Sequence, residues 1–157
     1  CKTKDLAFTF IVAALYIFLS TIFWKRTFPL VYFLFPTKTG LAFFLGGIVY
    51  YFAGALSVFV CVRYLAGKTA SYTEGLNIMS ISFIPLIIAV ILGFIFSFAA
   101  SEIAFFIEWF GGILSLLLIY NALRVHYELS IRSSIYLLPI IFIVLYIILR
   151  VFFKIFF

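Results

Sequence analysis

Long apolar runs separated by short polar breaks are the main pattern of this chain. Five runs approach the length of about 20 residues that a helix needs to cross a bilayer. They cover residues 6–23, 41–62, 75–98, 103–123 and 135–153. None of them alternates apolar and polar positions, and each is about twice as long as a strand of a membrane barrel. The pattern predicts an all-α integral membrane protein, a single-domain bundle of five transmembrane helices with short loops.

The composition supports the same fold class. The chain has 157 residues, of which 68% are hydrophobic, 22% aromatic and 10% charged, and its mean hydropathy is +1.34. A soluble domain carries about 25% charged residues, so water could not cover a surface built from this sequence. The many aromatic residues suit lipid-facing helix surfaces and the two membrane interfaces. We therefore expect lipid to surround most of the chain.

The basic residues are scattered in ones and twos between the apolar runs. The net charge is +6, but a face that binds nucleic acid needs clustered charge, so we expect no nucleic-acid partner. Five spans would place the two chain ends on opposite sides of the membrane. The Lys and Arg residues would then number six on one side and five on the other, a difference too small for the positive-inside rule to decide the orientation. The two groups are Lys2, Lys4, Arg63, Lys68, Arg124 and Arg132, and Lys25, Arg26, Lys38, Arg150 and Lys154.

The two cysteines and one short apolar stretch add three smaller expectations. Cys61 falls inside an apolar run and should pack as a small hydrophobic residue. Cys1 is a truncation point or a lipidated residue; we favour truncation, because a lipid tether adds little to several spanning helices. The stretch Phe28–Phe35, bounded by Pro29 and Pro36, is too short to cross a bilayer and indicates an interfacial or re-entrant turn.

The loop before the third run carries a helix-start signal. Ser71 and Glu74 have the spacing of a capping box, in which the hydroxyl accepts from a backbone N–H of the first turn and the carboxylate reaches back. The spacing predicts a helix that begins at the membrane surface. A contact of Lys68 and Glu74 with a partner is the alternative interpretation.

The third run combines a proline with a stripe of small residues. Pro85 removes one helical hydrogen bond and crowds a carbonyl one turn earlier. Ser82, Pro85, Ala89 and Gly93 recur at helical spacing, and such stripes let helices approach closely in lipid. We expect a packing seam with a kink. A hinge or a substrate path is the alternative.

The fourth run contains an acid, Glu108, beside Trp109. A charge at the centre of a spanning helix costs about 2.5–3.5 kcal/mol, so Glu108 should be interfacial, paired or protonated. Trp109 is a natural anchor at headgroup level and favours the interfacial position. Gly111, Gly112 and Ser115 continue the same helix face. Because acids inside membranes are often functional, Glu108 is a candidate site residue.

The loop between the fourth and fifth runs is polar. Arg124 and Glu128 lie one helical turn apart and could pair, although such a pair contributes only about 0.2–0.5 kcal/mol. His126 is the only histidine of the chain. A metal site needs several converging ligands, and no other ligand type joins His126 in the sequence. We expect a polar loop residue there, and neither a metal nor a cofactor.

Catalytic chemistry has little support in the sequence. No nucleophile has a base nearby, there is no HExxH motif and no phosphate-binding loop, and the five acids are spread over the chain. An intramembrane enzyme would place polar pairs at matched depths in its helices. We therefore expect a protein that is not an enzyme.

Three segments resemble the Yip domain family (Ypt/Rab-interacting), five-span membrane proteins of eukaryotic trafficking with many prokaryotic relatives. The first is the Gly67-Lys68 loop, which leads into a span with the central Pro85. The second is Trp109, which opens the fourth span. The third is the segment 122–130, which reads ALRVHYELS and ends in a Leu-Ser pair. Together they cover roughly residues 41–153.

The resemblance implies five spans with the N-terminus in the cytosol and the C-terminus outside. The Asp-Leu-Tyr-Gly-Pro motif of the eukaryotic members is absent, and so is their long N-terminal cytosolic segment. These departures indicate a prokaryotic-type relative. By analogy with the family, the partner would be an ABC exporter or a small GTPase.

These observations favour a non-enzymatic membrane protein that works through partners. It would act as a scaffold or organiser of the membrane, or as an accessory subunit of a transport or trafficking complex. Membrane lipids, other membrane proteins and further copies of the chain are the expected partners. The alternative function is a small transporter or channel, with a path near Pro85 and Glu108.

Overall fold

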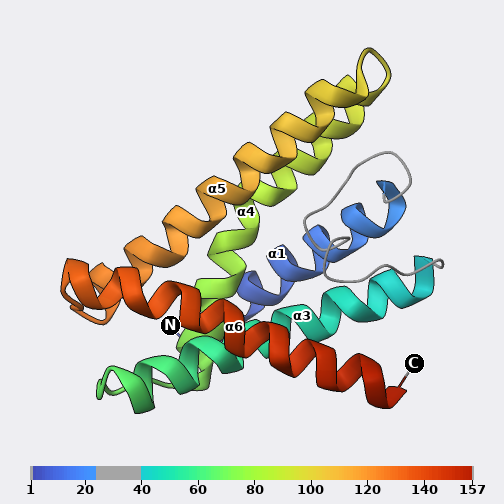
Figure 1. Cartoon of the computed structure of the whole chain (residues 1–157). Helices are drawn as coiled ribbons and strands as arrows, with labels where there is room; N and C mark the ends of the chain where they lie inside the picture. The colour runs from blue at the N-terminus through green and yellow to red at the C-terminus, as the bar shows by residue number, and fades with distance from the viewer. Residues whose placement is uncertain (1, 24–39, 157) are drawn as a thin grey trace.

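Five long helices build the structure, a computed structural model that describes residues 2–23 and 40–156 (Figure 1). They are α1 (Lys2–Phe23), α3 (Gly40–Val60), α4 (Tyr72–Ser97), α5 (Ser101–His126) and α6 (Ile131–Phe156). A single π-helical turn, η1 (Cys61–Leu65), continues α3. All five are long and apolar enough to cross a bilayer, which confirms the prediction of a multi-pass membrane protein. The turn predicted for Phe28–Phe35 and the interpretations of Cys1 lie outside the described residues.

The helices extend past the predicted apolar runs by at most four residues. α6, for example, begins at Ile131 rather than at residue 135, and α5 continues to His126 rather than ending at residue 123. The apolar pattern marks only the part of a helix that lipid surrounds. A helix continues beyond it because the intrahelical hydrogen bonds still satisfy its backbone in the polar interface.

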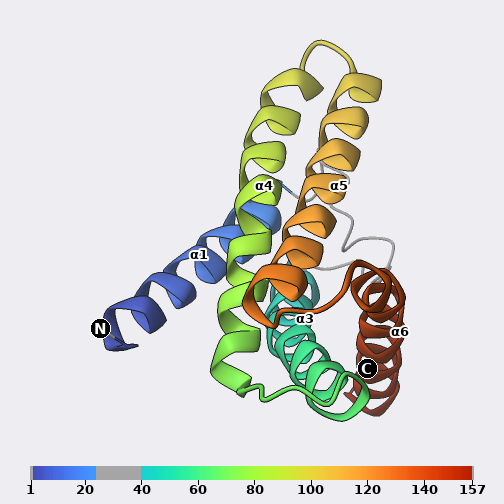
Figure 2. The same ribbon diagram turned by 90° about the vertical axis from the view of Figure 1, so that its left-hand side faces the viewer.

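Helix α4 lies at the centre of the bundle and packs against α5, α1 and α3. α6 packs against α3, η1 and α5. The loops 66–71 and 127–130 lie at the same end, on the left in Figure 1, and we call this end the loop end. The C-terminus lies at the opposite end, as an odd number of spans requires. Figure 2 looks at the molecule from the loop end.

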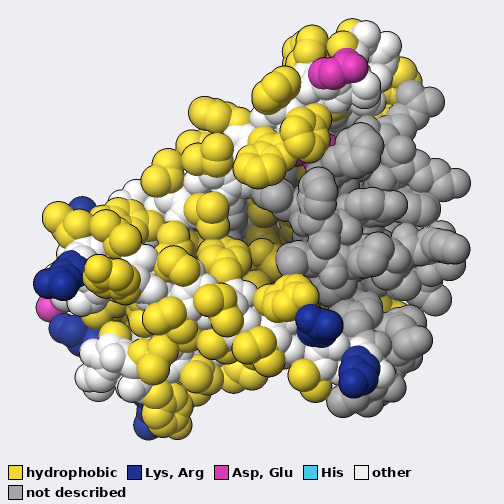
Figure 3. Space-filling view, viewed as in Figure 1, with side chains coloured by type: hydrophobic (Ala, Val, Ile, Leu, Met, Phe, Trp, Pro, Cys, Tyr) yellow, Lys and Arg dark blue, Asp and Glu magenta, His cyan; other side chains and the backbone are white. Residues whose placement is uncertain are grey.

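Apolar side chains fill the core and also cover the outside. Tyr51, Phe83 and Leu123 are almost completely buried, whereas Phe106 is 71% exposed and Ile11 65% exposed. Figure 3 shows hydrophobic side chains over the helices and basic side chains near the helix ends. Soluble monomers rarely expose apolar patches larger than a few hundred Å². The outer surface is therefore a lipid-facing surface.

Hydrogen bonds between helices join α1, α3 and α4. Thr9 Oγ1 of α1 donates to Asn77 Oδ1 of α4 at 2.6 Å, and Ser80 Oγ of α4 donates to the Thr9 carbonyl at 2.9 Å. The Tyr51 hydroxyl of α3 lies 3.1 Å from Ser80 Oγ. Such bonds contribute about 0.6–2 kcal/mol each in a membrane. They hold α1, α3 and α4 together in one arrangement, which the similar apolar outer faces of these helices would not specify alone.

The small-residue stripe of α4 packs against α5, as the sequence predicts. Gly111 of α5 sits so close to α4 that a Cβ there would collide with the Ala89 side chain and lie 3.2 Å from the Pro85 carbonyl oxygen. Gly93 of α4 likewise lets α5 approach closely, because a Cβ on Gly93 would crowd the Glu108 side chain. α4 bends partway along its length (Figure 1), as a helix with an internal proline does. The small residues of α4 therefore pack against α5 of the same chain, and we call this contact the α4–α5 seam.

We expect Gly111→Ala to weaken the α4–α5 contact. The added methyl group has no space between Ala89 and Pro85, and overpacking of this kind costs about 1–3 kcal/mol. Denaturant unfolding in detergent micelles measures the change in free energy. Leu117→Ala on the lipid-facing side of α5, where the side chain is 49% exposed, is the control and should change stability less. Equal losses of stability from the two substitutions would contradict the close packing of α4 against α5 at Gly111.

Candidate functional site

The first part of the site is the start of α4. Ser71 has an extended backbone and its Oγ accepts from the Glu74 N–H at 3.3 Å, while Glu74 Oε2 accepts from the Ser71 N–H at 2.9 Å. The predicted capping box is confirmed. The preceding turn contains Gly67 at φ +64°, a left-handed conformation that glycine adopts without penalty. The cap and the turn fix the position of Lys68 and Thr69 relative to α4.

The second part is the end of α5. His126 is its last residue, and Glu128 has φ +51°. Only glycine adopts that left-handed conformation freely, and another residue there costs roughly 1 kcal/mol. The predicted pairing of Arg124 with Glu128 is wrong, because the helix ends between them and they no longer share a helix face. Arg124 instead lies over the ring of Tyr120, 5.9 Å from its centroid.

The two loops meet and enclose a small polar hollow. His126 Nε2 of α5 lies 3.8 Å from Glu74 Oε1 of α4, so Glu74 caps its own helix and also faces the end of the next one. The hollow beside this contact has a volume of about 220 Å³. It is lined by Lys68, Thr69, His126, Tyr127 and Glu128. We call these five residues together with Glu74 the loop-end site; its two loops face the viewer in Figure 2.

Tyr127 is the buried member of the loop-end site. Its side chain is 5% exposed, and its hydroxyl makes no hydrogen bond of ordinary geometry among the described residues. Burial raises the pKa of the Tyr127 hydroxyl, and the negative charge of Glu74 nearby and the interaction of the hydroxyl with the Glu74 carboxylate raise that pKa further. The hydroxyl therefore remains a protonated hydrogen-bond donor throughout the physiological pH range.

Lys68 and Glu128 supply opposite charges to the loop-end site. Both are exposed. Among the residues whose side chains the structure describes, neither forms an ion pair, whereas His126 faces Glu74. The same residues contain no group of three or more His, Cys, Asp and Glu side chains that could hold a metal ion. The loop-end site offers hydrogen bonding and charge pairing at a membrane surface.

Glu108 lies elsewhere, between α4 and α5. Its side chain is only 3% exposed, and its Oε1 lies 3.1 Å from where a Cβ on Gly93 would be. Glu108 is therefore packed within the bundle, and its expected interfacial depth stays a prediction. Trp109, at 48% exposed, faces outward in its place. A helix turns by about 100° per residue, so two neighbours commonly face opposite environments.

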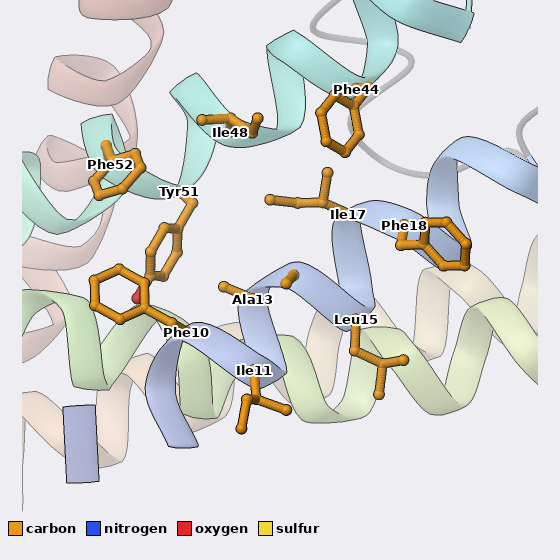
Figure 4. Close-up of a pocket in the computed structure, with 11 residues that line it drawn as sticks. Phe10, Ile11, Ala13, Leu15, Ile17, Phe18, Phe44, Ile48, Tyr51 and Phe52 are labelled. Atoms are coloured by element: carbon orange, nitrogen blue, oxygen red, sulfur yellow. The ribbon is translucent and has the colours of Figure 1, made fainter. Parts of the chain in front are cut away.

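A large apolar groove between α1 and α3 is the third feature of interest (Figure 4). Its volume is about 720 Å³. Phe10, Phe18 and Phe44 are among the residues that line it. Tyr51 contributes only its ring, because its hydroxyl lies 3.1 Å from Ser80 Oγ and 3.4 Å from the Leu76 carbonyl oxygen. The groove offers contact area but no free polar group of its own.

The structure gathers some of the candidate residues and separates others. Lys68, Glu74, His126 and Glu128 meet at the loop end although the two loops lie more than 50 residues apart in sequence. Arg124 lies two residues before the end of α5, and its side chain lies over Tyr120. Glu108 is 18 residues from His126 along α5, or about 27 Å at the helical rise. Pro85 and Glu108 thus belong to the α4–α5 seam.

Thr69 and Tyr127 are site residues that sequence reasoning missed. The sequence does show Tyr127 next to the candidate His126. Its burial depends on how the other loop covers it, which no local pattern reveals.

Comparison of the chain with protein-family models, with curated proteins and with solved structures found no match. The relationship to the Yip domain family therefore stays a prediction based on the three segments.

We expect Ser71→Ala to loosen the first turn of α4. Loss of an N-cap hydroxyl costs about 0.5–2 kcal/mol, and Glu74 would lose its reciprocal partner. Hydrogen exchange measured by mass spectrometry should show faster exchange at residues 72–75. Thr73→Ala, which removes a neighbouring exposed hydroxyl that plays no part in the cap, should leave that exchange unchanged.

Proposed function

We propose that this chain is a non-enzymatic membrane organiser or accessory subunit that binds a partner membrane protein at the loop end. The observation that carries the proposal is the loop-end site itself. Lys68 and Glu128 from two distant loops meet Glu74 and His126 from the adjoining helix ends there, held by a capping box and by the Glu74–His126 contact. The proposed role needs no cofactor, since binding uses only hydrogen bonds and charges.

The surroundings of the loop-end site fit a docking surface for a protein at the membrane. Arg63, Arg124 and Arg132 are exposed around it. The loops are short, so a partner must itself sit at the bilayer surface to reach them. Charged groups at the rim of an interface guide orientation and partner choice more than they add affinity. A membrane-bound partner with a complementary acidic surface is therefore the expected one.

The resemblance to Yip domain proteins agrees with this location. Two of the three segments that carry it, the Gly67-Lys68 loop and residues 122–130, contribute to the loop-end site. We propose accordingly a prokaryotic-type relative whose N-terminus and loop end face the cytosol. An ABC exporter subunit, or a small GTPase, is the corresponding partner by analogy alone.

Transport is the second candidate function, and the burial of Glu108 favours it. An acid enclosed between membrane helices is costly to keep, and such acids often bind protons or cations along a transport path. The bend at Pro85 is on the same seam. A transporter would need Glu108 for turnover, whereas an organiser would need it only for packing.

Charge reversal at Arg124 should weaken partner binding. Arg124→Glu places a negative charge beside the loop-end site, and we expect at least about a tenfold loss of the co-purifying partner, or roughly 1.4 kcal/mol. Affinity purification in mild detergent followed by identification of the eluted proteins measures it. Arg150→Glu is a matched control, because Arg150 also lies over a tyrosine one turn earlier, at 6.0 Å, but at the opposite end.

Two outcomes would contradict partner binding at the loop end. One is an unmodified chain that elutes alone and monomeric. The other is a partner that Arg124→Glu and Arg150→Glu reduce equally.

Neutralising Glu108 tests the transport alternative. Glu108→Gln keeps the volume of the side chain and removes its charge, so a transporter should lose most of its flux in reconstituted vesicles. An organiser should keep its partner in the purification above. Glu102→Gln changes an exposed acid in the first turn of α5 and serves as the control, with no expected effect on either measurement.

A further inference from the structure

We propose that the hollow of the loop-end site binds the headgroup of a phospholipid that carries both a phosphate and a primary ammonium group. In this arrangement Lys68 binds the phosphate and Glu128 binds the ammonium. The inference does not depend on the proposed partner, because it concerns the lining of the hollow rather than the surface around it.

The depth of the hollow places it among lipid headgroups. Its lining residues lie in the loops 66–71 and 127–130 or at the last residue of α5, directly beyond the ends of four membrane-crossing helices. Loops of six and four residues cannot carry the hollow far from the bilayer. The headgroup layer is about 5–7 Å thick on each side of the hydrocarbon. Phospholipid headgroups are therefore the most concentrated charged ligands at this position.

The charges of the lining match a zwitterion. Lys68 and Glu128 line the same hollow, yet they form no ion pair with each other. A ligand with one negative and one positive group would satisfy both charges at once. A purely anionic ligand would meet the carboxylate of Glu128, with Glu74 close by, and like charges disfavour binding.

Neutral donors in the lining suit a phosphate. The Tyr127 hydroxyl is buried without a hydrogen bond of ordinary geometry among the described residues, and Thr69 adds a second hydroxyl. A hydroxyl that donates to a charged phosphate oxygen forms a short, strong hydrogen bond. The Tyr127 hydroxyl interacts with Glu74, and a phosphate here would give it an acceptor of ordinary hydrogen-bond geometry.

The size of the hollow fits the headgroup. Its volume of about 220 Å³ equals the space of roughly seven water molecules at about 30 Å³ each. A phosphoethanolamine group has a similar number of non-hydrogen atoms. The acyl chains would remain outside, along the apolar surface of the neighbouring helices.

The backbone at Glu128 adds an independent reason to assign it a role. The residue keeps a carboxylate at φ +51°, where glycine would be unstrained. Strain of this kind is often found at binding sites, where the side chain is needed for contact. In the hollow, the carboxylate is the acceptor for the ammonium group.

The test compares lipids by native mass spectrometry of the purified chain. The protein is exchanged into micelles that contain equal amounts of phosphatidylethanolamine, phosphatidylcholine and phosphatidylglycerol. We expect at least tenfold more adduct with phosphatidylethanolamine, because the choline group cannot donate hydrogen bonds to Glu128 and the glycerol group carries no ammonium. Similar adducts with all three lipids would overturn the proposal.

Substitutions locate the binding to the hollow. Lys68→Ala and Glu128→Gln should each reduce the phosphatidylethanolamine adduct at least tenfold, while Arg132→Ala and Glu102→Gln should leave it unchanged. A thermal unfolding measurement checks that every variant remains folded. Retention of the adduct by both Lys68→Ala and Glu128→Gln would overturn the assignment of the site.

Soluble phosphoethanolamine separates the two possible sources of the headgroup. Competition that displaces the lipid adduct from the unmodified chain supports recognition of the headgroup itself. Binding of soluble phosphoethanolamine together with no lipid adduct would overturn the lipid as the ligand. Arg124→Glu, which tests the partner, changes no residue that lines the hollow, so the two proposals can fail separately.

Discussion

Close approach of α4 to its neighbours is the interaction on which the rest of this structure depends. Lipid tails solvate apolar side chains as well as another helix does, so burial of apolar area no longer drives helices together. Contact must come from tight packing and from hydrogen bonds. α4 supplies both: it meets Gly111 of α5 through Ala89, and Ser80 and Asn77 bond to α1 and α3. The remaining apolar surface is free to face lipid.

The position of the loop-end site follows from this packing. Because α4 and α5 run antiparallel along the seam, the start of α4 and the end of α5 arrive at the same end of the bundle. Glu74 then serves both helices, since one carboxylate oxygen caps α4 and the other faces His126. A short loop on each side completes the hollow. The site is therefore built from helix ends held by the seam rather than from freely moving loops.

Two features of the seam show how burial changes the interpretation of a residue. Small residues in a membrane helix are available to a partner only where no helix of the same chain occupies them, and here α5 covers those of α4. Glu108 likewise has its side chain turned into the protein, while Trp109 faces outward. Both results come from rotation of α5 about its axis, which packing against Gly93 and Ala89 sets.

The order of apolar and polar residues by itself determined the five membrane helices, their approximate ends and the cap at Ser71, because each depends on neighbours within a few residues. It also indicated that α4 packs through small residues. Only the tertiary structure decided that Lys68 and Glu128 line one hollow, that Tyr127 is buried there and that Glu108 faces inward. Those facts depend on which helices pair and at what rotation, and lipid-facing sequences specify this weakly because most of their apolar faces are alike.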